Sequence, residues 1–568
     1  MPQRIEYPVE PHHIAVLGKP APWRRCWTLR PLHRGRFSLF VQPEYVPANR
    51  WSYRIDLSFP DAHGPPERVE ITIPEPVRRF HRWTWKLVEW PKDRFVDIHE
   101  PGRSERTPPD SELLFLQRPA MEGVFSLVAD SGSEPHRLLA WSCNQPFDTS
   151  EEGHLIRHAV TDDAFEWYRK QTLAFDPHLV WGLGDTAYSD GTEASDFVND
   201  YYDRPALLQS TEAKSELLHH YRHMYRNHWS FAGMQTAMRN FPHCFIWDDH
   251  EIRDGWGSEA DDFSGRNTTI FHCARQAAEE YILNSGPRIR QLGHYAPTPL
   301  GGRRTSSKQH SPSQSGLNED AHQAYIEGDV AAFIFDGRMS RKYNDPGGKV
   351  ISQRQLKDFQ AFCRRVAQQR NVRFLLLGNS VPFINLVEFL ERLGSAAPKP
   401  LTDLLGGMRD DIRDGWHSPG NIGQLEQIIS TLRHLHRQNG SLEMINISGD
   451  IHTANLFSFQ PPGFTRALYQ VTSSALTNRV FPPDWANEII QVGSTAFSET
   501  LGVINRLWPT VSDPNLLLLE PVNNRLRLVL KVLDLDAQGE ARGSLNSEKD
   551  LVYEVGKHRF SGQHLVMP

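Results

Sequence analysis

The 568-residue sequence predicts an α/β layered domain that follows a small antiparallel β domain. Residues 1–136 contain short alternating stretches, at 37–42, 53–59 and 68–73, separated by Pro, Asn and Gly. Alternation bounded by turn residues is typical of antiparallel strands. From about residue 137, apolar runs alternate with segments that are long enough for crossover helices, which is typical of layered α/β folds.

Six apolar runs define the expected strands of the layered domain: RLLAWSC, PHLVWGLGD, CFIWDD, VAAFIFD, RFLLLGN and EMINISGD. A helix is predicted over residues 352–366, because one face at helical spacing carries Leu356, Phe359, Phe362, Cys363 and Val366. We assign this core to residues 137–480, with a surface loop at 301–316 and a longer insertion at 385–420 that could form a lid. Residues 481–568 form a C-terminal extension that packs on the core and contains strand patterns at 525–535 and 550–555.

Composition excludes several classes of protein. The net charge of −7 does not favour nucleic acid or an anionic membrane as the main partner. The five cysteines lie far apart without a CxxC pair, so neither a disulfide framework nor a structural zinc module is expected. The N-terminus lacks the pattern of a signal peptide, and no run of 18 apolar residues predicts a membrane span. We therefore expect a cytoplasmic protein.

Residues 245–256, FIWDDHEIRDGW, place Asp248, Asp249, His250 and Glu251 directly after an apolar run that is typical of a buried strand. Burying an ionised carboxylate without a partner costs several kcal/mol or more. Either the strand reaches the surface here and its acids are solvated, or something in the fold compensates for them.

Similar side chains follow the other five runs. They are Cys143, Asp185 with Tyr188, Asp336, Asn379, and Asp450 with His452. Each has an ordinary explanation: a small buried thiol, a helix cap, a turn residue or a core histidine. In an open α/β sheet, however, ligands bind beyond the carboxyl ends of the strands. Several acids that face one crevice repel one another unless cations lie between them, so we favour a metal cluster.

Three blocks resemble those of a known family. LGDTAY (183–188), WDDHEIRDGWGS (247–258) and SGDIH (448–452) resemble, in this order, the GDxxY, WDDHE and GDxH blocks of the PhoD-like alkaline phosphatases, a branch of the calcineurin-like metallophosphoesterases. SCNQ (142–145), FDGR (335–338), GNSV (378–381) and DGW (414–416) support the resemblance. It covers roughly residues 137–480, and the N-terminal β domain also has a counterpart in that family. The implied fold is a four-layer metallophosphoesterase-type α/β sandwich.

The resemblance implies a two-metal site in which Asp185 bridges both ions. The first metal would also be bound by Cys143, Tyr188 and His452. The second metal would also be bound by Asp249, Asn379 and Asp450. Thiolate, phenolate and imidazole ligands suit a transition metal such as iron, whereas oxygen ligands suit Ca²⁺, Mg²⁺ or Mn²⁺. The family makes Fe³⁺ and Ca²⁺ the expected pair, with Mn²⁺, Mg²⁺ and Zn²⁺ as alternatives.

The implied activity is that of a metal-dependent phosphoric-ester hydrolase. Two metals about 3.5–4 Å apart would clamp the ester oxygens, lower the pKa of a bound water and present hydroxide in line with the leaving group. His250 is the candidate general acid, with Asp248 or Glu251 orienting it. A third metal ligand or a structural hydrogen bond is the alternative for His250. Arg338 could hold a phosphate oxygen bidentately, or could form a supporting pair with Asp336.

The sequence leaves the substrate open. A small-molecule, lipid or polymer phosphate ester would fit, and monoester and diester substrates cannot be separated, because the same clamp serves both. Trp416 and His417 could approach the substrate or pack the predicted lid. Two other functions compete with hydrolysis: a non-catalytic binding or scaffold protein on a phosphatase fold, and a metal-dependent nuclease. The missing basic strip with interleaved aromatic residues argues against the nuclease, and no specific nucleic acid is expected. Secreted members of the family usually carry a twin-arginine signal, and this sequence shows none.

Overall fold

The structure is a computed structural model of the chain. It describes residues 7–21, 24–44, 53–61, 64–73, 82–90, 118–127, 136–150, 154–190, 197–265, 267–283, 285, 320–342, 348–384, 415–416, 418, 420–477, 495–535 and 549–555. The predicted loop at 301–316 and most of the predicted insertion at 385–420 lie outside these residues.

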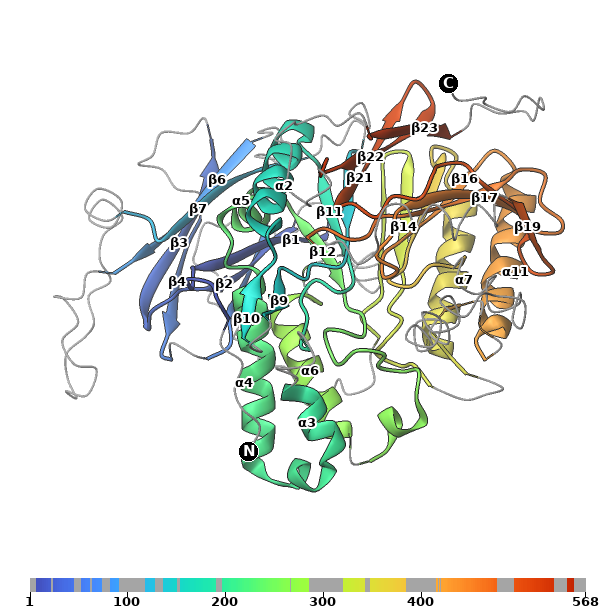
Figure 1. Cartoon of the computed structure of the whole chain (residues 1–568). Coiled ribbons are helices and arrows are strands. Elements are labelled where there is room, and N and C mark those ends of the chain that lie inside the picture. The colour runs from blue at the N-terminus through green and yellow to red at the C-terminus, as the bar shows by residue number, and fades with distance from the viewer. Residues whose placement is uncertain are drawn as a thin grey trace.

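Two large sheets form the centre of the molecule (Figure 1). The first contains β1 (Ile14–Ala21), β2 (Arg24–Arg30), β5 (Glu67–Thr72), β8 (Leu138–Trp141), β11 (Leu179–Leu183), β12 (His243–Ile246), β21 (Asn515–Val522), β22 (Arg525–Val532) and β23 (Leu551–Val555). Its strand order is β23-β22-β21-β8-β11-β12-β1-β2-β5. Strands β8, β11 and β12 run parallel to one another, so their carboxyl ends lie at one edge of the sheet.

The second sheet contains β13 (Gln323–Glu327), β14 (Val330–Ile334), β15 (Phe374–Gly378), β16 (Glu443–Ser448), β17 (Asn455–Gln460), β18 (Leu468–Thr472), β19 (Thr495–Ser498) and β20 (Gly502–Arg506). Its order is β13-β14-β15-β16-β18-β17-β20-β19. Strands β14, β15 and β16 are parallel here. The six predicted core strands therefore all form, but they divide equally between two sheets.

The two sheets pack face to face. Their shared core contains Leu138, Trp181 and Ile246 from the first sheet and Ile334 and Leu376 from the second. Successive strand residues point to opposite faces, so the neighbours of these side chains face outward and need helices to cover them. Both outer faces are covered, which confirms the predicted four-layer α/β sandwich.

Each outer face has its own set of helices (Figure 1). The first sheet is covered by α2 (Thr161–Phe175), α4 (Thr211–His228), α5 (Ala232–Asn240) and α6 (Thr268–Tyr281), and the shorter α3 (Phe197–Asp203) lies beside α4. The second sheet is covered by α7 (Gln353–Ala367) and α11 (Ile422–Gln438). Helix α7 confirms the helix predicted at 352–366. Ser352 caps its N-terminus by accepting a hydrogen bond from the Gln355 N–H, and all five predicted core residues are buried.

The N-terminal part contains a four-stranded antiparallel sheet made of β3 (Gly35–Pro43), β4 (Tyr53–Phe59), β6 (Arg82–Glu89) and β7 (Met121–Ser126), in the order β4-β3-β6-β7. It packs on β1, β2 and β5 through a core that includes Trp27, Trp83 and Trp85. This sheet thus covers the stretch of the first large sheet that the second large sheet does not cover. Strand β1 also pairs in parallel with β12, which joins the N-terminal β structure to the layered core.

The C-terminal residues extend both large sheets, with β19 and β20 at one edge of the second and β21 to β23 at one edge of the first. A two-stranded ribbon of β9 (Phe147–Thr149) and β10 (Leu155–Arg157) follows β8. The positions proposed as domain boundaries, near residues 137 and 480, stay predictions. Within the part of the chain that is described, no helix is both long enough and apolar enough to cross a membrane.

Candidate metal centre

The carboxyl ends of β8, β11 and β12 meet those of β15 and β16 at one edge of the sandwich. The Cys143 N–H donates to the Gly184 carbonyl, and the Asn144 N–H donates to the Asp185 carbonyl. Across the sheets, Ser380 Oγ donates to Asp248 Oδ1 at 2.9 Å. The loops after these strands therefore converge, as the sequence predicted, although the strands come from two sheets.

Four acids form the centre of this edge. Carboxylate oxygens of Asp185, Asp248, Asp249 and Asp450 all lie within 4.8 Å of one another. Asp185, Asp248 and Asp249 are buried, and Asp450 is partly buried. Like charges at this spacing repel, so the arrangement requires compensating cations or protonation.

Three further predicted ligands lie beside Asp185 or beside one another. The Cys143 sulfur lies 3.6 Å from Asp185 Oδ2, and the Tyr188 hydroxyl lies 3.4 Å from the same oxygen. The Tyr188 hydroxyl also lies 3.5 Å from His452 Nε2. Cys143 and Tyr188 thus lie at the same oxygen of Asp185, and His452 lies beside Tyr188.

The buried oxygens in this region that lack a hydrogen-bond partner among the described residues include Oδ1 of Asp185 and Oδ1 of Asn379. Asp185 and Asn379 are each only 1% exposed. Buried polar atoms are usually paired, so such atoms require an explanation. Together with a thiol, a phenol, an imidazole and several carboxylates, they form a donor set that fits both a transition metal and an oxygen-ligated cation.

Backbone strain is concentrated at the same loops. Cys143, Asp185, Asp450 and His452 have φ angles of 52°, 49°, 74° and 49°. Residues other than glycine rarely adopt this left-handed region, and each such residue costs about 1–3 kcal/mol. Four strained residues around one cluster indicate that the fold fixes their side-chain directions for a purpose other than stability.

Glycine is required before two of these aspartates. A Cβ atom at Gly184 would lie 2.9 Å from the Cβ of Ser380, which follows β15 of the second sheet, and Gly184 has a φ of +93°. A Cβ atom at Gly449 would lie 2.4 Å from the Cβ of Ser142. The glycines of both GD pairs therefore allow the strand ends of the two sheets to approach closely.

The electrostatics follow from burial and from the crowding of acids. Burial raises the pKa of Asp185 well above its ordinary value, and Asp249 and Asp248 add to this effect although His250 opposes it. Burial and then Asp185 raise the pKa of the Cys143 thiol. Burial also opposes ionisation of Asp249, but Arg338 and His250 outweigh it and hold the pKa of Asp249 below its ordinary value. A cation in the cluster would favour the charged forms of these ligands.

His250 lies beside the cluster, with its ring centroid 4.1 Å from that of Tyr188. Its Nδ1 lies 2.8 Å from Asp190 Oδ1, and its Nε2 lies 3.7 Å from Asp254 Oδ1. Sequence reasoning missed both acids. The available signal was modest: Asp190 follows Tyr188 closely in LGDTAYSD, and Asp254 lies in the RDGW segment.

The expected orienting role of Asp248 or Glu251 toward His250 needs correction. Glu251 is 0% exposed and accepts backbone N–H bonds from Asp185 at 3.0 Å, from Asp248 at 2.7 Å and from Thr186 at 2.5 Å. Its carboxylate thus fixes the backbone of the two loops that carry Asp185 and Asp248. Burial raises the pKa of Glu251 to about 7. Asp248 contacts Ser380 and Arg338 instead of His250.

Arg338, which was expected to contact a phosphate oxygen, contacts other protein groups instead. The side chain of Arg338 is 0% exposed and pairs with both Asp248 and Asp249, and it donates to the Trp256 carbonyl at 2.6 Å. Its guanidinium therefore lies behind the two acids and compensates their charge. The alternative side-chain pair with Asp336 does not form either, because Asp336 accepts the backbone N–H of Arg338 and the indole N–H of Trp247.

Trp416 is 1% exposed and packs against Phe335 and Phe383, with ring centroids 5.9 and 5.6 Å away. It therefore belongs to the packed core of the second sheet and its helices. His417 lies outside the described residues.

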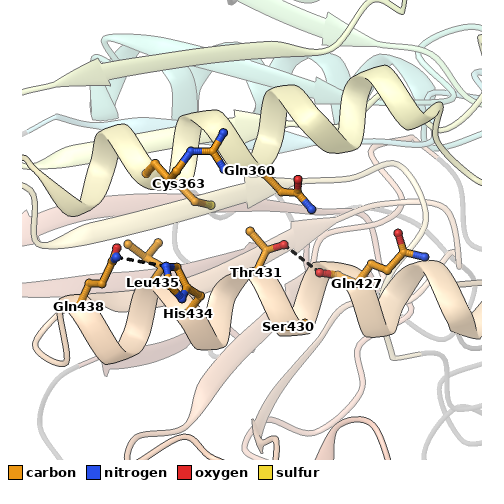
Figure 2. Close-up of a pocket in the computed structure, with 9 residues that line it drawn as sticks. Gln360, Cys363, Gln427, Ser430, Thr431, His434, Leu435 and Gln438 are labelled. Atoms are coloured by element: carbon orange, nitrogen blue, oxygen red, sulfur yellow. Dashed lines mark hydrogen bonds between the residues drawn. The ribbon is translucent and has the colours of Figure 1, made fainter.

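A separate groove of about 390 Å³ lies between α7 and α11 (Figure 2). Its lining combines polar side chains, such as Gln360, Thr431 and Gln438, with Cys363 and Leu435. None of the predicted site residues lines this groove, so its position does not bear on the metal centre.

Comparison with known proteins agrees with this fold. A family model described as PhoD-like phosphatase matches residues 139–496. The uncharacterized protein YGR266W of Saccharomyces cerevisiae is 21% identical over 446 residues, which cover 65% of this chain and 60% of the yeast protein. The chain thus matches less than two thirds of the length of that relative.

Solved structures are similar as well. The structure of PhoD aligns over 98% of this chain and 94% of that chain with a TM-score of 0.55, at 12% sequence identity, a likeness that concerns the fold alone. A dimetal phosphatase from Danio rerio aligns over 74% of this chain and 99% of that chain, with 10% identity and a TM-score of 0.35. Because the family model matches more than half of its length, the chain belongs to the PhoD-like phosphatase family.

Proposed function

We propose that the protein is a metal-dependent phosphoric-ester hydrolase. The observation that carries this proposal is the cluster of Asp185, Asp248, Asp249 and Asp450, whose oxygens lie within 4.8 Å of one another. The thiol of Cys143, the phenol of Tyr188 and the imidazole of His452 lie beside this cluster. The protein also belongs to a phosphatase family. Structural stability does not account for acids, a thiol and strained backbone gathered at one edge.

We propose two metal positions around Asp185. Cys143, Tyr188 and His452 would hold one ion, for which Fe³⁺ is our proposal, and Asp249, Asn379 and Asp450 would hold the other, for which we propose Ca²⁺. When bound, the ions would supply Lewis-acid activation of the ester and of a water molecule. The unpartnered oxygens of Asp185 and Asn379 support this assignment.

His250 is proposed as the general acid that protonates the leaving alkoxide. The Asp190 carboxylate at Nδ1 would hold the ring and leave Nε2 to deliver a proton. Burial lowers the pKa of His250, but the charges of Asp190, Asp249 and Asp185 reverse this and raise it well above its ordinary value. A protonated imidazole beside the cluster suits a proton donor.

Glu251 and Arg338 are proposed to act on the site through other residues. Glu251 fixes the loops of Asp185 and Asp248 through their backbone N–H groups. Arg338 holds Asp248 and Asp249 in place and compensates part of their charge. Neither side chain would touch the substrate.

The substrate is proposed to be a small-molecule, lipid or polymer phosphate ester. The test combines metal analysis of the purified protein with turnover of p-nitrophenyl phosphate and bis-p-nitrophenyl phosphate. We expect bound metal, hydrolysis of at least one ester and loss of hydrolysis on chelation. The relative rates would assign monoester or diester preference. A metal-free protein without turnover of either ester would contradict the proposed function.

A further inference from the structure

A line of three buried amide side chains leads away from the metal centre. Asn379 follows β15, Asn446 lies in β16 and Gln470 lies opposite Asn446 in the neighbouring strand β18. All three are at most 2% exposed. Asn379 Nδ2 donates to Asn446 Oδ1, and Asn446 Nδ2 donates to Gln470 Oε1 at 3.3 Å. We call this line the amide ladder.

The far end of the amide ladder is fixed by backbone. Ile384 N–H donates to Gln470 Oε1 at 2.8 Å, and Gln470 Nε2 donates to the Ile384 carbonyl at 2.8 Å. A backbone N–H can only donate and a carbonyl can only accept, so Gln470 cannot turn its amide over without opposing like groups. The direction of the amide of Gln470 is therefore set.

This direction passes along the ladder. Because Gln470 presents its oxygen to Asn446, Asn446 must turn its amino group toward Gln470 and its oxygen toward Asn379. Asn379 must then donate its own amino group to Asn446, which leaves Asn379 Oδ1 on the other side. That oxygen is the buried atom for which the described residues offer no hydrogen-bond partner.

We propose that Asn446 and Gln470 are positioning residues that carry the polarity of the Ile384 backbone to Asn379, so that its carbonyl oxygen, and not its amino group, faces the metal centre. The inference rests on the proposed function, since it takes Asn379 as a ligand of the second ion. The amino group of an amide can only donate hydrogen bonds and does not bind a cation, whereas an amide oxygen is a normal ligand of Ca²⁺. An inverted Asn379 would remove a ligand without any change in sequence.

The chain offers a matched control. Asn455 lies in β17, the other neighbour of β18, and is 0% exposed. Its side-chain amide has no hydrogen-bond partner within the described part of the chain. Replacing Asn455 or Asn446 by leucine thus makes the same chemical change in the same sheet, but only the second breaks the amide ladder.

The experiment measures Ca²⁺ affinity by calorimetric titration after EGTA treatment, and iron content by elemental analysis, in the full-length protein. Asn446→Leu and Gln470→Leu should each weaken Ca²⁺ binding about 10–100-fold, the usual effect of losing a partner that orients a ligand, while iron content stays unchanged. The double variant should be no weaker than the worse single variant, because both act along one path. Asn455→Leu should bind Ca²⁺ like wild type.

A rescue variant guards against a general folding defect. Asn379→Asp presents an oxygen whichever way its carboxylate turns, so Asn446→Leu should have no further effect on Ca²⁺ affinity in that background. Wild-type affinity in Asn446→Leu, an equal loss in Asn455→Leu, or an additive loss in Asn379→Asp would each overturn the inference while leaving the hydrolase proposal intact. A wild-type protein that binds no metal would instead refute the proposed function, and this inference with it.

Discussion

Nδ1 of His250 lies 2.8 Å from Oδ1 of Asp190, and this contact joins two of the loops that form the metal centre. The other carboxylate oxygen of Asp190 accepts the backbone N–H of Asp254, so a single side chain holds both the imidazole and the turn that follows it. Ser189 strengthens the same junction, because its hydroxyl donates to the Ile252 carbonyl at 3.0 Å. The position of His250 thus depends on a residue far from it in sequence.

The first prediction concerns proton transfer by His250. His250→Ala should slow esters with poor leaving groups, such as phenyl phosphate, about 10²–10⁴-fold, and p-nitrophenyl esters much less, because the more basic phenoxide gains more from protonation than p-nitrophenoxide does. Asp190→Asn should show the same pattern more weakly. The measurement is kcat/KM for a series of leaving groups, with metal content determined for each variant.

Ser189→Ala is the control for this series, because it removes a bond between the same two loops without touching the imidazole. It should leave the dependence on the leaving group unchanged. Equal slowing of all esters by His250→Ala, or loss of metal, would move His250 from proton donor to metal ligand.

The second prediction concerns the acids. Asp185→Asn and Asp249→Asn should each abolish measurable hydrolysis and lower the bound metal, because an amide is neutral and offers one ligating oxygen instead of two. The fold should survive, since the replacement preserves side-chain volume; circular dichroism and elemental analysis check both points. Turnover near that of wild type with full metal content in either variant would refute the two-metal assignment.

The third prediction concerns metal identity. A tyrosinate bound to Fe³⁺ has a broad visible charge-transfer band, so the purified protein should be coloured if Tyr188 ligates a ferric ion. Tyr188→Phe should bleach or shift this band, and Cys143→Ser should weaken iron retention, because a hydroxyl is a poorer anionic donor than a thiolate. Visible absorption and iron analysis provide the readout. An active, colourless protein that carries only zinc would contradict the assignment.

The fourth prediction concerns acid stability. His243 is 0% exposed, and burial lowers its pKa to about 4 from an ordinary 6.5. The unfolded chain therefore binds a proton between these pH values that the folded protein does not bind, so the free energy of unfolding falls as pH falls from 6.5 to 4. The contribution of His243 is at most about 3 kcal/mol. His243→Gln should flatten this dependence.

Urea unfolding at several pH values in this range measures the effect. His154→Gln, at an exposed position, is the matched control and should keep the wild-type slope. A slope that His243→Gln leaves unchanged would show that other groups dominate the acid transition.

The elements of the core and the metal-binding character of the edge were determined by the sequence itself. Alternation and apolar runs predicted the strands that became β3, β8, β11 and β16, because side-chain burial imposes these patterns locally. Helical spacing predicted α7 and the residues it buries. The acids after the apolar runs predicted a cluster, because the carboxyl ends of strands in an open α/β sheet face one crevice.

Tertiary structure alone decided which strands lie side by side and which side chains meet. Strands that are buried on both faces read as continuous apolar runs, so nothing in them specified that β8, β11 and β12 form one sheet and β14, β15 and β16 another. The pairing of Arg338 with Asp248 and Asp249, and of Asp190 with His250, depends on that packing. Such contacts join residues distant in sequence, and local patterns carry no information about them.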